Sequence, residues 1–108
     1  MSRYGIYCML TEEEYGTLAK LAEKKAISGA GWMRMQIMGV TTDQIEEIVA
    51  QNPVKEATRN VEFNRLCKAC VKDHLVALAK ELQDGSEAIV LRALLQKAIK
   101  EEANEQAK

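Results

Sequence analysis

Residues 3 to 38 read RYGIYCMLTEEEYGTLAKLAEKKAISGAGWMRMQIM, and this stretch decides the fold that we expect. Its first part has a two-residue period, which is typical of a strand with one buried and one exposed face. The alternating sets are Tyr4, Ile6, Cys8 and Leu10 on one face and Arg3, Gly5, Tyr7 and Met9 on the other. A strand needs a partner for its backbone amides and carbonyls, so this single strand predicts pairing between two copies of the chain.

Two helices are expected after the strand. Thr11 offers a side-chain N-cap, and Glu14 stands where it completes a capping box. Glu12 and Glu13 place negative charge at the helix start, where the helix dipole favours it. Ser28 opens the second helix, which carries a dense apolar cluster. The cluster consists of Trp32, Met33, Met35, Ile37 and Met38.

The stretch resembles the ribbon-helix-helix family of DNA-binding proteins, the Arc and MetJ type, which includes relaxosome accessory proteins of plasmid mobilisation. The likeness rests on three features: the alternating strand that ends at Leu10 and Thr11, the apolar core of residues 18–22, and the Ser28-x-x-x-Trp32 opening of the second helix. It covers about a third of the chain. In that family two strands from two subunits form an antiparallel ribbon that enters the major groove, and the second helices hold phosphates at their N-termini.

The resemblance assigns roles by matching position. The residues that it places against the bases are Arg3, Gly5, Tyr7 and Met9. Those that it places against phosphate are Ser28 and Gly29, with Lys24 and Lys25 flanking them. The dimer core would hold Ile6, Cys8, Leu10, Trp32, Met33 and Ile37. For the methionine-rich helix, a soft docking surface for another protein is the alternative.

Composition bounds the function. The 108 residues carry a formal net charge of −1, which argues against a general nucleic-acid binder, because nonspecific affinity needs many neutralised phosphates. Three cysteines are an odd number, and the N-terminus lacks a basic, apolar leader, so we expect a cytoplasmic protein. No apolar run approaches the length of a membrane span, so we expect no membrane partner.

The remainder of the chain is predicted to be helical. Thr42 and Asp43 begin a short helix that ends before Pro53. A longer helix is expected from about residue 55 to 82, with an apolar stripe at spacings of three and four. A final helix follows Ser86 and packs on it as a hairpin. The expected organisation is a dimerisation and DNA-binding unit at 1–40 and a helical extension at 41–108, whose hairpin needs a partner for its apolar faces.

Two patterns in this extension have alternative interpretations. Leu18-Ala19-Lys20, Ser28 and Arg34 are echoed by Leu78-Ala79-Lys80, Ser86 and Arg92. A tandem of two ribbon-helix-helix units, with residues 66–70 as the second strand, would explain the echo, but we favour coincidence between amphipathic helices. Cys67, Cys70 and His74 share one face of the expected long helix. Three ligands fall short of a structural zinc site, so core packing is the better interpretation.

We therefore expect a mainly α protein with an N-terminal ribbon strand, without catalytic, metal or cofactor chemistry. Its expected function is DNA binding as a homodimer or higher homo-oligomer, in the manner of a transcriptional regulator, an antitoxin or a relaxosome accessory protein. A helical protein–protein assembly module on the same dimer scaffold is the alternative. The surface of the paired strands discriminates between them, since a basic ribbon favours DNA and an acidic or apolar one favours a protein partner.

Overall fold

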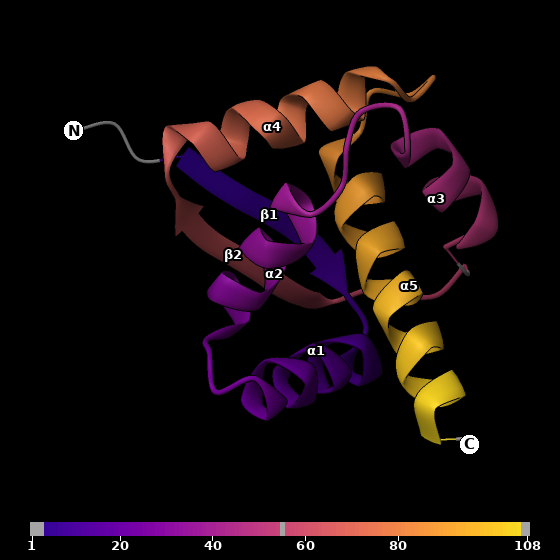
Figure 1. The fold of residues 1–108 in the computed structure, drawn as a ribbon. Coiled ribbons are helices and arrows are strands. Elements are labelled where there is room, and N and C mark those ends of the chain that lie inside the picture. The colour runs from indigo at the N-terminus through magenta and orange to yellow at the C-terminus, as the bar shows by residue number, and fades with distance from the viewer. Residues whose placement is uncertain (1–3, 55, 107–108) are drawn as a thin grey trace.

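The computed structural model describes residues 4–54 and 56–106 and is mainly helical, with a two-stranded sheet. In Figure 1, α2 and α5 lie in front of the strands, with α4 above them and α1 below. The elements in chain order are β1 (Tyr4–Leu10), α1 (Glu12–Lys24), α2 (Gly29–Met38), α3 (Ile45–Gln51), β2 (Val61–Cys67), α4 (Ala69–Lys80) and α5 (Glu87–Gln106).

The two strands form an antiparallel ribbon within one chain. The register runs from the Tyr4–Cys67 pair to the Leu10–Val61 pair. This corrects the prediction that β1 pairs with β1 of a second copy. Residues 61–67 supply the partner strand, although the spacing of their apolar residues predicts a helix.

Basic side chains cover carbonyls along both strands of the ribbon. Lys72 Nζ donates to the carbonyl of Gly5 at 3.0 Å, and Arg92 Nε donates to the carbonyl of Met9 at 3.0 Å. On β2, Arg65 Nη1 donates to the carbonyl of Asn64 at 2.9 Å. Alternate residues of a paired strand point their carbonyls away from the partner strand, where they invite further pairing. These three contacts leave the ribbon less able to recruit another strand.

The chain consists of two β-α-α halves, which we call the N-terminal half (residues 4–38) and the C-terminal half (residues 61–106). β1, α1 and α2 form the first half, and β2, α4 and α5 form the second. One constant spacing separates Leu10 from Cys67, Leu18 from Leu75 and Ala22 from Ala79, and all six of these residues are buried. Between the halves, α3 packs against α5.

The repeat corrects the preferred interpretation of the internal echo as coincidence. The matched residue of Leu18 is Leu75 rather than Leu78, and the second strand is residues 61–67 rather than 66–70. Ser28 and Ser86 do match, because each accepts a bond from a backbone amide in the first turn of its helix. The echoed residues of α2 and α5 therefore occupy matching positions. In α1 and α4 the echoed residues do not match, because Leu18 corresponds to Leu75.

A single hydrophobic core joins both halves and draws on residues from both 1–40 and 41–108. The residues assigned to a dimer core are 0 to 1% exposed within one chain: Ile6, Cys8, Leu10, Trp32, Met33 and Ile37. Their burial needs no second copy. The C-terminal helices also bury their apolar stripes here, through Leu75, Leu78, Val90, Leu91, Leu94 and Leu95. The hairpin thus finds its expected partner in the N-terminal half.

The expected long helix is wrong in its first part and right in its second. Residue 55 lies outside the described residues, 61–67 form β2, and the helix begins at Ala69. Cys67 therefore lies on the strand, and Cys70 is exposed on α4. The His74 ring nitrogen Nε2 lies 2.6 Å from the carbonyl oxygen of Val40. The three residues do not share one buried helix face.

The other helix predictions fare better. Thr11 and Glu14 form the expected capping box, with Glu14 N donating to Thr11 Oγ1 at 3.0 Å and Thr11 N donating to Glu14 Oε1 at 2.8 Å. The short helix exists as α3, but it begins at Ile45 and its N-cap residue makes no side-chain cap bond. The expected cap at Thr42 and Asp43 is wrong.

Candidate functional site on the outer face of the ribbon

The ribbon has one covered face and one open face. Ile6, Cys8, Leu10 and Phe63 point inward and are fully buried. The residues that point outward, which we call the ribbon face, are Gly5, Tyr7 and Met9 on β1 and Glu62, Asn64 and Leu66 on β2. They form three opposed pairs, Gly5 with Leu66, Tyr7 with Asn64 and Met9 with Glu62. The open face is therefore a short platform two strands wide.

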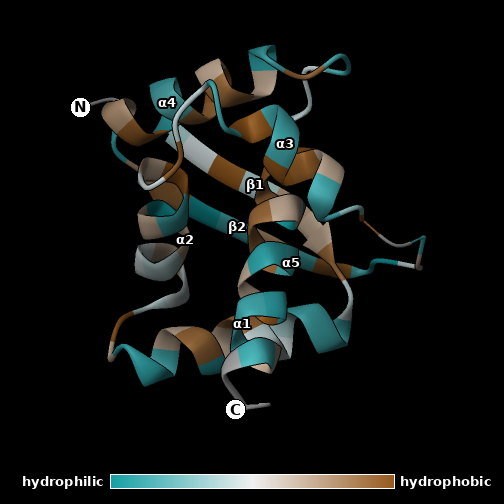
Figure 2. Ribbon diagram, turned by 45° about the vertical axis from the view of Figure 1, so that its right-hand side comes forward, coloured by the Kyte–Doolittle hydropathy of each residue, from teal (hydrophilic) through white to brown (hydrophobic). Residues whose placement is uncertain are grey.

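The ribbon face is more apolar than basic. Tyr7 is 50% exposed and Leu66 is 57% exposed, and both are large apolar side chains. Glu62 supplies one negative charge, whereas none of the six outward residues is basic. The Tyr7 hydroxyl donates to Met9 Sδ at 3.1 Å, and Asn64 Nδ2 donates to Glu62 Oε1 at 3.3 Å. Figure 2 shows β1 as mostly apolar and the middle of β2 as hydrophilic.

A buried ion pair fixes the entry into β2. Arg59 donates to both carboxylate oxygens of Glu14, at 3.0 and 3.1 Å, and Gln96 Nε2 donates to Glu14 Oε2 at 3.0 Å. Burial alone raises the pKa of Glu14, but the bonds from Arg59, Thr11 and Gln96 outweigh it and hold the pKa below its ordinary value of 4.5. This network ties α1 and α5 to the segment that leads into β2.

The N-termini of α2 and α5 occupy matching places in the two halves but differ in charge. At α2, Ser28 Oγ accepts from the amide of Gly31 at 3.0 Å, and the first helical residue is Gly29. At α5 the matching first residue is Glu87, whose carboxylate pairs with Lys72. A helix N-terminus attracts anions unless a carboxylate already occupies it. Of these two helix starts, that of α2 has no carboxylate in its first turn and that of α5 has one.

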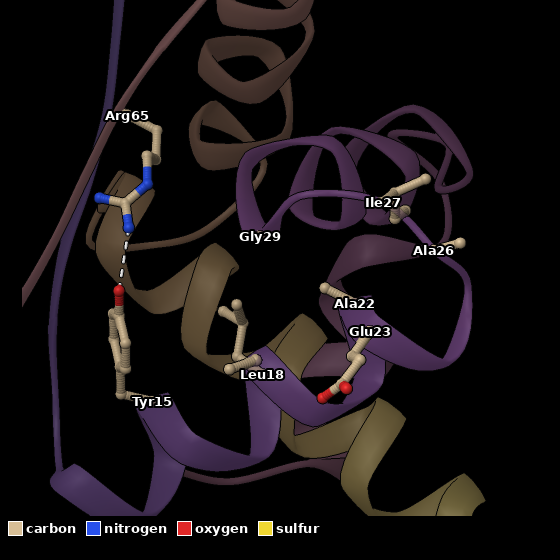
Figure 3. A pocket seen from close by; sticks show the side chains of 9 residues that line it. Tyr15, Leu18, Ala22, Glu23, Ala26, Ile27, Gly29 and Arg65 are labelled. Carbon is tan, nitrogen blue, oxygen red and sulfur yellow. Dashed lines mark hydrogen bonds between the residues drawn. The ribbon is translucent and has the colours of Figure 1, made fainter.

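A shallow hollow of about 400 Å³ lies beside the start of α2 (Figure 3). Arg65 Nη2 donates to the Tyr15 hydroxyl at 2.9 Å on one side of it, and Glu23 lies on the other side. Gly29 forms part of the wall, and a Cβ there would lie 3.1 Å from Leu18 Cδ2. The glycine thus lets α2 approach α1 closely, which is a structural reason for a residue that the resemblance assigned to phosphate binding.

The structure places the remaining predicted site residues as follows. Gly5, Tyr7 and Met9 do lie on the open face, while Arg3 lies outside the described residues. Lys25 is exposed at the end of α1, but Lys24 forms an ion pair with Glu102 of α5. Sequence reasoning missed Glu62, Asn64 and Leu66 because β2 was assigned to a helix. The alternation of Glu62, Asn64 and Leu66 with Val61, Phe63 and Cys67 was the available signal, and Arg65 on the inner face obscured it.

Buried thiols contribute no reactive group to this face. Burial raises the pKa of Cys8 to about 11 and also raises the pKa of Cys67. Among the described residues, no three His, Cys, Asp or Glu side chains are placed together to hold a metal ion. Within the same residues, no helix has the length and apolar character needed to cross a membrane.

Comparison of this chain with protein-family models, with curated proteins and with solved structures finds no match.

Proposed function

We propose that this protein binds double-stranded DNA through the ribbon face, with one chain supplying both strands of a ribbon-helix-helix unit. The observation that carries the proposal is the antiparallel ribbon itself, covered by helices on one face and open on the other. A seven-residue strand is about 23 Å long, and paired strands lie about 4.8 Å apart. The major groove is about 12 Å wide and admits a two-stranded ribbon.

The helices around the ribbon support the same function. Each strand is followed by two helices, in the order that the ribbon-helix-helix resemblance implies. The start of α2 offers amides for a phosphate, with exposed Lys25 nearby in the chain. The start of α5 carries Glu87, so phosphate contacts are expected mainly on the α2 side. A regulator, an antitoxin or a relaxosome accessory protein would all use such a surface.

The lack of positive charge on the ribbon face sets the expected mode of binding. Few phosphates can be neutralised, so nonspecific affinity should be low and the dependence on salt shallow. Contacts with particular bases must then account for most of the preference for one DNA sequence over another. We expect one protein chain per DNA site rather than two, because both strands of the ribbon come from one chain.

Titration of fluorescent genomic DNA fragments with the full chain at about 50 mM salt tests the proposal. Tyr7→Glu places a charge at the centre of the open face and should abolish binding while leaving the helical circular dichroism unchanged. Met38→Glu is the matched control, since Met38 is equally exposed, at 51%, on α2. Absence of any complex with the unmodified protein at micromolar concentration would contradict DNA binding.

A second candidate is a protein-binding module that uses the same face. The exposure of Tyr7 and Leu66 favours it, since exposed apolar side chains without basic neighbours are typical of protein interfaces. This function predicts that Tyr7→Glu weakens binding of a protein partner and that DNA titration shows no complex.

A further inference from the structure

The ribbon face lacks two-fold symmetry although the backbone repeats. Positions related by the β-α-α repeat carry Gly5 and Glu62, Tyr7 and Asn64, and Met9 and Leu66. In a ribbon made from two identical strands each of these pairs would hold the same residue. Tyr7 and Asn64 also oppose each other directly at the centre of the ribbon. A symmetric ribbon would present the same residue twice at its centre. This ribbon presents the aromatic ring of Tyr7 and the amide of Asn64 instead.

Asn64 is oriented by its neighbour on the same strand. Its Nδ2 donates one hydrogen to Glu62 Oε1 at 3.3 Å, and since a carboxylate only accepts, this contact fixes which end of the amide is nitrogen. Among the described residues, no other hydrogen bond engages Nδ2 or Oδ1 of Asn64, so the second hydrogen of Nδ2 and the lone pairs of Oδ1 can contact a ligand. Gly5 lies diagonally across the ribbon from Asn64, and because it has no side chain it leaves Oδ1 uncovered, whereas a Cβ there would contact Oδ1 at 3.9 Å.

One free donor beside one free acceptor matches adenine in the major groove. Adenine presents N7 as an acceptor and its N6 amino group as a donor, and an Asn amide contacts both at once. Tyr7 offers one hydroxyl oxygen and Leu66 no polar atom, so neither can contact N7 and N6 with two separate polar groups as the Asn amide does. We infer, resting on the DNA-binding function proposed above, that this chain reads a non-palindromic sequence in which Asn64, oriented by Glu62, selects one adenine.

Selection of bound sequences from a random double-stranded DNA library with the full-length protein tests this inference. The enriched motif should be non-palindromic and should hold an adenine that the protein prefers over other bases by about 10- to 100-fold. Asn64→Ala and Asn64→Thr should each remove that preference. For a DNA site in which the preferred adenine is replaced by another base, both variants should have the same affinity as the unmodified protein. Glu62→Gln should reduce the preference, because an amide no longer fixes the orientation of Asn64.

Gln51→Ala, which removes an exposed amide from α3 on the far side of α5, is the matched control and should leave the motif unchanged. Threonine suits an exposed strand position, so Asn64→Thr keeps the test valid if the alanine variant folds poorly. A palindromic motif, or an adenine preference that survives both Asn64 variants, would overturn the inference and leave DNA binding intact. Absence of any enriched or bound DNA would overturn the proposed function and this inference together.

Discussion

In the N-terminal half, the Thr11 hydroxyl caps α1, whereas in the C-terminal half the matching residue, Lys68, has the same extended backbone but makes no side-chain cap bond. The two helices nevertheless begin at matching places after matching strands. At the next matched position the buried residue is Glu14 in one half and Val71 in the other. This difference indicates that the buried apolar residues and the strand register specify the backbone of both halves. The helix caps and the polar networks differ between the halves and are not needed to specify it.

The largest expected effect concerns Phe63, which is fully buried on β2 opposite Cys8. Phe63→Ala should lower the free energy of unfolding by about 4 kcal/mol, through lost burial and the cavity left behind. Leu66→Ala, on the outward face of the same strand, should cost less than about 0.5 kcal/mol. Urea denaturation measures both. Equal losses for the two variants would mean that residues 61–67 do not alternate as a strand.

The ion pair between Glu14 of the N-terminal half and Arg59, just before β2, gives the next largest effect. Glu14→Gln keeps the shape of the side chain but removes the negative charge that faces the mostly buried Arg59 guanidinium, so the free energy of unfolding should fall by about 3 kcal/mol. Glu13→Gln is the matched control on the exposed side of the same turn and should change little. If chemical denaturation gave the two variants the same stability, the Glu14 network would not stabilise the fold.

Acidification should act through the same carboxylate. The folded-state pKa of Glu14 lies below 4.5, so the unfolded chain binds a proton there more readily than the folded one. Its contribution to stability is therefore complete above about pH 4.5 and is lost as the pH falls through the lower, folded-state pKa. Measured against pH, the stability difference between the unmodified protein and Glu14→Gln should shrink in this range. A difference that stays constant down to about pH 3 would contradict the role of this carboxylate.

The smallest effect should come from equalising the caps. Lys68→Thr gives α4 the cap residue that α1 already has, and should raise the free energy of unfolding by about 0.5–1 kcal/mol. Thr11→Ala should lower it by about 1 kcal/mol. Thermal unfolding of the two variants, side by side, provides the comparison. A Lys68→Thr protein that is less stable than the unmodified one would show that the start of α4 is held by other contacts.

The sequence predicted the N-terminal half well because its signals are local. Alternation from Tyr4 to Leu10, the capping box at Thr11 and the cap at Ser28 all appear in the structure. In the C-terminal half the cap at Ser86 is also local, but Arg65 interrupts the apolar alternation of the strand and Lys68 replaces the capping threonine. In addition, Phe63 and Cys67 fall by chance on the helical spacing that continues into α4.

Local sequence patterns also could not identify the strand that pairs with β1. Strand pairing is a long-range contact, and a single alternating strand states only that a partner exists. Because the apolar spacing of residues 61–67 predicts a helix, the sequence leaves a second copy of the chain as the expected partner of β1. The helix prediction for residues 61–67 also hides half of the ribbon face, including Asn64, which we propose to select an adenine.

β1 and β2 of the same chain form the ribbon. NMR detection of backbone-proton contacts between Tyr7 and Asn64 tests it most directly, in a uniformly labelled sample and in an isotope-filtered mixture of labelled and unlabelled chains. We expect these contacts to appear in the uniform sample and to vanish from the filtered spectrum, which reports only contacts between chains. Their presence in the filtered spectrum would contradict it, because the ribbon would then be shared by two copies.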